Sequence, residues 1–221
     1  MSFYEQLIAA TCAEREQLLA APIIADCLQG RVTRAGYLAF LGQAYHHVRH
    51  TTPLLMSVGG RLPDRLAWLR TAVAEYIEEE IGHEEWILND IAAGGGDADA
   101  VRASQPELPA ELMVAYAYDL VSRKNPAGFF GMVFVLEGTS VALALMAADR
   151  IQLALALPDN AFSYLRSHGT LDQAHTKHLA ELLEQMDAGD QQEVVRCARV
   201  FYRLYGDIFR ALPSGEESPC S

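Results

Sequence analysis

The chain has 221 residues, of which 51% are hydrophobic, and its formal net charge is −12 with a pI near 4.9. This length and hydrophobic content suffice for one large domain with a sizeable core, which excludes wholesale disorder. The acidic balance argues against nucleic acid and anionic membrane surfaces as partners.

The N-terminus reads as an amphipathic helix, because it lacks the basic region and apolar stretch of a signal peptide. Four cysteines are scattered with no CxxC pair, and we interpret them as reduced thiols of a cytoplasmic protein. They are Cys12, Cys27, Cys197 and Cys220.

Hydrophobic residues recur with a helical period throughout the chain, and no stretch shows the alternation of a strand. Breakers rich in Gly, Pro, Asp and Asn separate the periodic segments. We therefore predict one all-α domain over residues 1–212, followed by a disordered tail at 213–221. The seven predicted helices span 3–20, 33–58, 64–91, 108–123, 127–156, 160–186 and 189–212.

Residues 127–148 are long and apolar enough for a membrane span, but Glu137 interrupts them centrally. We predict a buried central helix of a helical bundle instead. A buried, unpaired carboxylate is costly, so Glu137 should have a compensating partner.

The stretch 64–91 carries polar residues on its apolar stripe. Stepping by three and four residues from the last apolar position before the gap leads to Glu80 and His83, which should therefore face the core. The neighbouring carboxylates, which are Glu78, Glu79, Glu84 and Glu85, should mostly be solvated. The stripe itself consists of Leu66, Leu69, Val73, Tyr76 and Ile87.

The stretch 160–186 shows the same anomaly. Its period places His168, Asp172 and His175 on one face, whereas His178 is slightly out of phase. Two histidines and an aspartate on a buried face are hard to satisfy by packing alone. The apolar stripe is defined by Phe162, Leu165, Leu179, Leu182 and Met186.

Three helices thus bring three carboxylates and three imidazoles to the interior. A dinuclear metal site would offset their charge, and mixed nitrogen and oxygen ligands suit iron, with manganese as the alternative. Glu-x-x-His is also how helical bundles present ligands to paired irons. The predicted ligands are Glu80, His83, Glu137, His168, Asp172 and His175.

In order and spacing, Glu80-x-x-His83, Glu137 and His168-x-x-x-Asp172-x-x-His175 resemble the ligand set of the heme-oxygenase-like di-iron oxidases and oxygenases. The resemblance covers roughly residues 30–212. It implies a seven-helix heme-oxygenase-like fold, often dimeric, which thiaminase II (TenA) and the PQQ-synthesis oxygenase share. It also implies two irons, dioxygen as co-substrate and oxidation of an amino-acid- or fatty-acid-derived substrate.

Other members of this superfold are alternatives. Thiaminase II uses a mid-chain cysteine nucleophile, but no cysteine lies between Cys27 and Cys197, and Gln43 stands near that family's acidic pyrimidine-binding position. Heme oxygenase needs a proximal histidine that the first helix lacks, and a ferritin-like protein needs a second Glu-x-x-His. A non-catalytic pyrimidine-binding protein and an iron store or sensor also stay open.

Substrate-binding residues are less well determined. His47 lies on the apolar stripe of 33–58, and ordinary core packing is the alternative for the aromatic residues. We expect a small-molecule substrate, a homodimer and an external electron donor. The predicted cavity residues are His47, Tyr76, Phe130, Phe134 and Tyr164.

Overall fold

The computed structural model describes residues 1–214, without the side chains of residues 170–174. The described part is helical and contains no strand, which confirms the predicted all-α class. Most of the predicted tail, from residue 215, and the side chain of Asp172 lie outside the described residues.

Twelve α-helices and three short 3-10 helices make up the described residues, more than the seven helices predicted. The N-terminal half contains α1 (Phe3–Ala10), α2 (Cys12–Leu19), α3 (Pro22–Leu28), α4 (Arg34–Val48), α5 (Thr51–Arg61), η1 (Asp64–Leu66), α6 (Leu69–Glu80), α7 (His83–Ala93) and α8 (Ala98–Ala103). The C-terminal half contains α9 (Leu108–Arg123), η2 (Pro126–Gly128), α10 (Phe129–Leu155), η3 (Asp159–Ala161), α11 (Ser163–Glu184) and α12 (Ala188–Ala211).

Two of the five extra α-helices, α3 and α8, lie between predicted helices, and the other three arise because predicted helices are interrupted. The stretch 3–20 breaks at Thr11, 33–58 breaks at Arg49–His50, and 64–91 breaks at Ile81–Gly82. Gly82 adopts φ +90°, a left-handed conformation that residues with a Cβ rarely adopt. Glu80 therefore ends α6 and His83 begins α7, so the two do not share one continuous helix.

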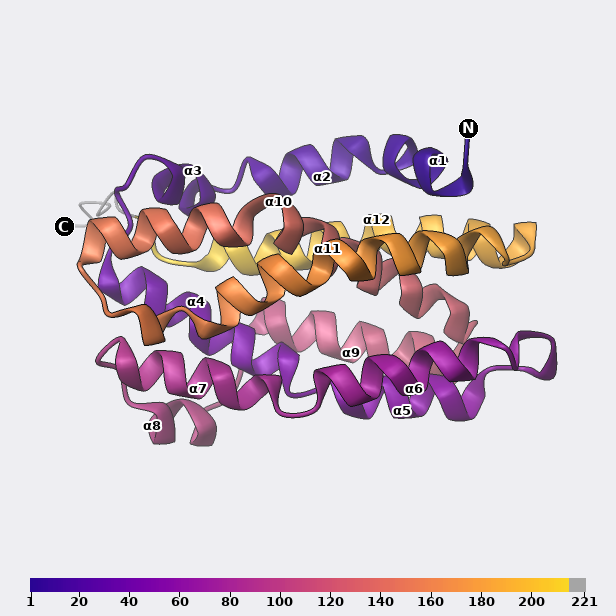
Figure 1. The fold of residues 1–221 in the computed structure, drawn as a ribbon, viewed down its shortest axis with the longest axis horizontal. Helices are drawn as coiled ribbons and strands as arrows, with labels where there is room; N and C mark the ends of the chain where they lie inside the picture. Colours follow the sequence, from indigo (N-terminus) through magenta and orange to yellow (C-terminus); the bar gives the residue numbers. More distant parts are fainter. Residues whose placement is uncertain (215–221) are drawn as a thin grey trace.

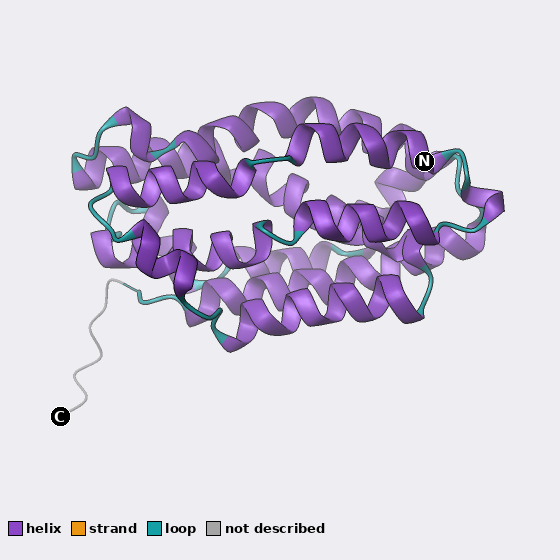
Figure 2. Ribbon diagram, turned by 90° about the horizontal axis from the view of Figure 1, so that it is seen from below, coloured by secondary structure: helices purple, strands orange, loops and turns teal. Residues whose placement is uncertain are grey.

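The helices lie lengthwise in an elongated bundle (Figures 1 and 2). Figure 1 shows α1 to α3 along one side, α5 to α7 along the opposite side, and α10, α11 and α12 between them. The central helix α10 packs against α11 and α12, and it also contacts α3 and α9. This arrangement places Glu137, in the N-terminal third of α10, inside the bundle.

The segment Pro126–Leu155, which includes α10, is long and apolar enough to cross a membrane, with a mean hydropathy of 1.9 over its most apolar window. Half of that window is buried within the protein, as a core helix would be. The contacts of α10 with α3, α9, α11 and α12 support the prediction of a central bundle helix.

Close packing of α10 on α12 depends on Gly131. A Cβ built there would lie 2.7 Å from the carbonyl oxygen of Val194 and 2.8 Å from the backbone nitrogen of Ala198. Facing residues of α12 follow the three- and four-residue spacing of an amphipathic helix. Its buried residues include Val194, Cys197, Ala198, Phe201, Tyr202, Tyr205, Ile208 and Phe209.

Candidate metal centre and cavity

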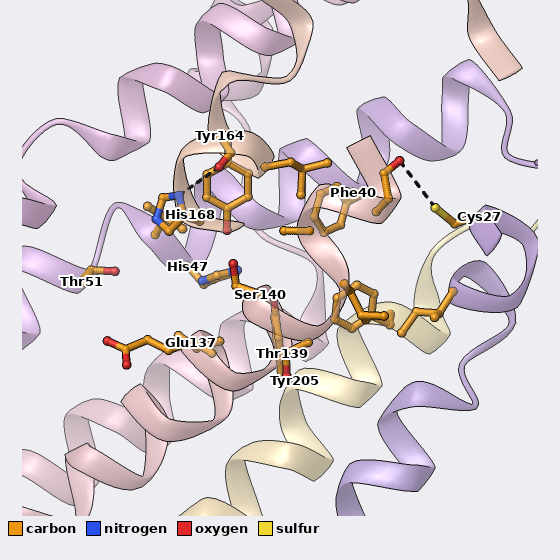
Figure 3. Close-up of a pocket in the computed structure, with 18 of the residues that line it drawn as sticks. Cys27, Phe40, His47, Thr51, Glu137, Thr139, Ser140, Tyr164, His168 and Tyr205 are labelled. Carbon is orange, nitrogen blue, oxygen red and sulfur yellow. Dashed lines mark hydrogen bonds between the residues drawn. The ribbon is translucent and has the colours of Figure 1, made fainter. Parts of the chain in front are cut away.

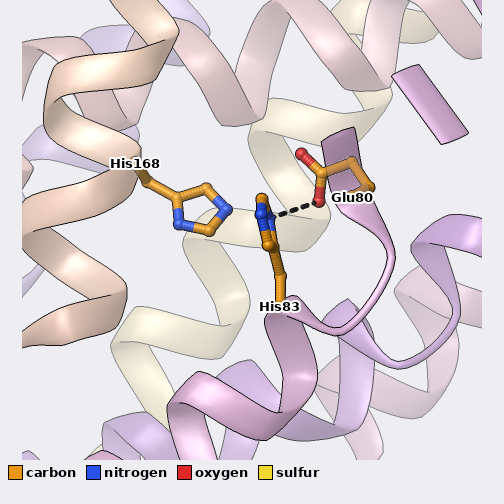
Figure 4. A group of neighbouring side chains, drawn as sticks. All are labelled: Glu80, His83 and His168. Carbon is orange, nitrogen blue, oxygen red and sulfur yellow. Dashed lines mark hydrogen bonds and ion pairs between the residues drawn. The ribbon is translucent and has the colours of Figure 1, made fainter. Parts of the chain in front are cut away.

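Glu80, His83 and His168 come together between α6, α7 and α11 (Figure 4). Each offers one ligand atom, and these atoms lie within 4.8 Å of one another. Two ligands on one ion are at most about 4.2 Å apart, because protein ligand bonds to such ions are about 2.1 Å long. Side-chain shifts of a few tenths of an ångström would therefore let all three bind one ion.

Glu80 and His83 meet across the break at Gly82. The Nδ1 atom of His83 lies 3.1 Å from Oε2 of Glu80, and the His83 side chain is almost fully buried. Burial alone would raise the pKa of Glu80, but its hydrogen bond with His83 and the nearby imidazoles of His168 and His175 leave that pKa below its ordinary value. The carboxylate is therefore held in the charged form that binds cations.

His168 is oriented by its own helix. Its Nδ1 atom lies 3.0 Å from the carbonyl oxygen of Tyr164. A carbonyl only accepts hydrogen bonds, so Nδ1 carries the proton and Nε2 keeps the lone pair that a metal needs. The rings of His83 and His168 lie edge to face with centroids 4.8 Å apart, and Trp86 stacks on His83 at 3.9 Å.

Asp90 ties the two histidine-bearing helices together. This carboxylate of α7 is fully buried and accepts hydrogen bonds from the backbone N–H groups of Ser163 at 3.0 Å and Tyr164 at 2.8 Å. The Ser163 hydroxyl also donates to it. These bonds satisfy free N–H groups in the first turn of α11 and fix its start against α7. Asp90 thereby sets where His168 lies relative to His83.

Glu137 and His175 lie together beside this group. The His175 Nδ1 atom is 3.9 Å from Oε1 of Glu137, and its Nε2 atom is 3.0 Å from Oε2 of Glu79. Glu137 is buried and lines the same cavity as Glu80 and His168. Five of the six predicted ligands thus converge on one region, whereas the side chain of Asp172 lies outside the described residues.

A cavity of about 170 Å³ extends from these residues into the bundle (Figure 3). Its carboxylates, Glu80 and Glu137, lie at the metal-ligand group, and no Lys or Arg is among the described residues that line it. Most of the remaining wall is apolar. It includes Cys27, Phe40, Leu55, Met132, Leu143 and Ile151.

His47 lines this cavity, as predicted, and is 3% exposed. Burial is the main cause that lowers the pKa of His47 to about 3, with smaller contributions from neighbouring histidines. Its imidazole is therefore neutral near pH 7. Tyr76 and Tyr164 also line the cavity, in agreement with the sequence prediction.

Phe130 and Phe134 do not line this cavity, and the prediction that they form its wall is wrong. Both are buried in the main hydrophobic core, where Phe134 packs edge to face on Tyr4. The face of α10 that lines the cavity is offset by about one residue along the sequence from the face that was predicted. It carries Phe129, Met132, Val133, Leu136, Glu137 and Ser140.

Sequence reasoning missed Glu79, Trp86, Asp90 and Ser140 near this site. Glu79 was placed among solvated carboxylates, yet it contacts His175 while its side chain is still 49% exposed. Asp90 lies seven residues after His83, two helical turns along the same face, and this spacing was a signal that could have identified it.

Solved structures with the same arrangement of helices define the class of fold. A domain of unknown function with a heme oxygenase-like fold from Shewanella denitrificans OS217 matches with a TM-score of 0.85 and 24% identity, over 95% of this chain and 90% of that one. A TenA homologue from Pseudomonas syringae pv. tomato matches with a TM-score of 0.79 and 12% identity, over 93% and 90%. Heme oxygenase from Leptospira interrogans matches with a TM-score of 0.75 and 15% identity, over 96% and 100%.

The protein therefore has a heme-oxygenase-like fold. No curated protein sequence matches the chain. A family described as iron-containing redox enzymes matches residues 38–206. This range includes α5, α6, α10 and α11, which line the cavity, and α7, which carries His83. The chain belongs to this iron-containing redox enzyme family.

Proposed function

We propose that the protein is a non-heme oxidase or oxygenase that holds two irons and uses dioxygen to oxidise a small amino-acid- or fatty-acid-derived molecule. The observation that carries the proposal is the convergence of Glu80, His83 and His168 at an apolar cavity, in a chain of an iron-containing family. Nitrogen and oxygen donors in this mixture suit iron.

Glu80, His83 and His168 would hold one ion, and Glu137 and His175 would contribute to a second. Asp172, whose side chain is outside the described residues, stays a predicted ligand. Ferrous iron, when bound, would supply the electrons that reduce dioxygen. Manganese is the alternative metal.

The protein's own groups prepare the site for this chemistry. The Tyr164 carbonyl holds His168 with Nε2 free, and Asp90 fixes α11 against α7. The apolar wall excludes water from the substrate and so limits side reactions. Tyr76 and Tyr164 border the cavity near the histidines, where they can orient a bound molecule.

The TenA homologues among similar structures raise the alternative of a thiaminase-like hydrolase or pyrimidine-binding protein. Among the described residues, Cys27 is the cysteine that lines the cavity. Burial raises the pKa of its thiol to about 11, whereas a nucleophilic cysteine needs a lowered pKa. This raised pKa argues against Cys27 as the nucleophile of a hydrolase.

Iron content after anaerobic reconstitution tests the metal assignment. The wild-type chain should approach two irons, and His83→Ala or Glu137→Ala should each lose at least one. Glu78→Ala is the matched control, since Glu78 is an exposed carboxylate on the same helix as Glu80. Unchanged iron content in both site variants would remove the proposal.

Oxygen uptake by the ferrous protein, measured against a panel of amino acids and fatty-acid derivatives, tests the activity. Uptake that depends on one class of compound is expected. Iron binding with no substrate-dependent uptake would instead indicate storage or sensing. The homodimer, the cytoplasmic location and the external electron donor stay predictions.

A further inference from the structure

Two buried polar atoms lie in the cavity wall without a hydrogen-bond partner among the described residues. They are Nδ1 of His47, on α4, and Oγ of Ser140, on α10. Nearly all buried polar groups in folded proteins are hydrogen-bonded, so such atoms need a partner that the protein itself does not provide. Both residues line a cavity that a ligand can enter.

His47 and Ser140 lie between the metal-ligand end and the apolar end of the cavity. In the view of Figure 3, His47 and Ser140 lie between Glu137 and His168 on one side and Phe40 and Cys27 on the other. A molecule that reaches the metal-ligand group from the apolar end would pass both. Its polar group would meet them close to the place where iron is expected.

The two groups select for an uncharged partner. His47 is a neutral, buried imidazole whose ring packs edge to face on Tyr205, with centroids 5.7 Å apart. A serine hydroxyl both donates and accepts, and a neutral imidazole offers one donor and one acceptor nitrogen. No Lys or Arg lines the described cavity to neutralise an anion, and its carboxylates, Glu80 and Glu137, are predicted metal ligands that bound iron would neutralise. Burying an unpaired charge of either sign is costly.

We propose that the cavity binds an uncharged amphiphilic molecule, with an apolar body along the wall and a hydroxyl, carbonyl or amide group hydrogen-bonded by His47 and Ser140. This inference rests on the proposed function, because the same molecule would be the substrate. Among the amino-acid- and fatty-acid-derived classes, it selects neutral derivatives over free carboxylates.

Thr139 provides a matched control in the same wall. Its hydroxyl also belongs to a cavity-lining residue, but it donates to the Val135 carbonyl at 2.7 Å within α10. That hydroxyl is already hydrogen-bonded, unlike the one of Ser140. Replacing it with a methyl group by Thr139→Val should not change the recognition of a ligand.

The test uses the 221-residue chain in its metal-free form and three probes with the same six-carbon chain: hexan-1-ol, 1-fluorohexane and hexanoate. Affinities are measured by calorimetry and by fluorine NMR for wild type, His47→Phe, Ser140→Ala and Thr139→Val. Hexan-1-ol should bind about tenfold more tightly than 1-fluorohexane and hexanoate. His47→Phe and Ser140→Ala should each weaken the binding of hexan-1-ol about five- to tenfold, since each removes one hydrogen bond.

The same two substitutions should change the affinity for 1-fluorohexane by less than twofold. Thr139→Val should change the affinity for every probe by less than twofold. Equal weakening of hexan-1-ol and 1-fluorohexane would show that the two residues only shape the cavity, and tighter binding of hexanoate would also overturn the inference. Ser140→Ala removes a single oxygen, so the test stands even if His47→Phe fails to fold. Because no iron is present, failure of the metal assignment would not alter these results, and normal iron binding without hexan-1-ol binding would refute this inference alone.

Discussion

Replacing Gly131 by alanine inserts a methyl group between α10 and α12. The new carbon would lie 2.7 Å from the Val194 carbonyl oxygen, whereas ordinary contact begins near 3.4 Å, so the helices must separate by roughly 0.7 Å. Both close atoms belong to the backbone and cannot move aside by a change of rotamer. We therefore expect a cost at the upper end for overpacking, about 3 kcal/mol.

Alanine also forms helix better than glycine, by about 0.8–1 kcal/mol. The net loss in free energy of unfolding at Gly131 is then about 2 kcal/mol. For a protein of this size, that corresponds to a fall in Tm of about 4–8 °C. Since α10 carries Glu137, iron affinity should fall as well.

Gly138→Ala is the matched control on the same helix, because a Cβ there meets nothing within 4 Å. Only the gain in helix propensity remains, and Tm should rise by about 2–4 °C. Thermal unfolding followed by circular dichroism measures both variants. Equal shifts in Tm, or stabilisation by Gly131→Ala, would refute the close-packing argument.

Three further changes probe other parts of the fold. Asp90→Ala should reduce the free energy of unfolding by about 2–3 kcal/mol, because the first turn of α11 loses its carboxylate acceptor. It should also weaken iron binding. Chemical denaturation measures the free energy of unfolding, and an unchanged value would contradict this prediction. Asp190→Asn should cost about 1–2 kcal/mol at pH 7, since Asp190 accepts hydrogen bonds from Arg65 and Asn125. The hydrogen bond from Arg65 lowers the pKa of Asp190 in the folded protein. The stabilisation is therefore present above the unfolded pKa of about 3.9 and is lost as pH falls through the folded pKa. A difference in stability between wild type and Asp190→Asn that persists at pH 2 would argue against this. Phe130→Ala should reduce the free energy of unfolding by about 3–5 kcal/mol, because it leaves an empty space in the hydrophobic core. The affinity for hexan-1-ol should stay unchanged. A large change in that affinity would show that Phe130 lines the ligand cavity after all.

The helical class and the interior position of Glu137 could be predicted from the sequence because hydrophobic periodicity reports burial directly. The breaks could not be predicted in the same way. Gly82 is a single glycine in a helical pattern, and only the tertiary structure shows that it adopts φ +90° and separates α6 from α7. The proximity of Glu80 and His83 was predicted from helical phase, but it arises across that break.

Side-chain contacts that depend on how neighbouring helices pack could not be predicted from the sequence either. Phe130 and Phe134 are apolar and buried, as expected, but the packing of α10 on α12 turns them away from the cavity. The contact of Glu79 with His175 joins two helices far apart in sequence. Periodicity gives the buried face of one helix, whereas a cavity wall depends on how several helices meet.

The central claim is that Glu80, His83 and His168 bind iron. Crystals of the chain reconstituted with ferrous iron, measured at the iron absorption edge, test it most directly through anomalous scattering. We expect an anomalous peak enclosed by these three side chains and a second one beside Glu137 and His175. Peaks confined to surface carboxylates such as Glu78, with the three side chains in contact only with one another, would contradict it.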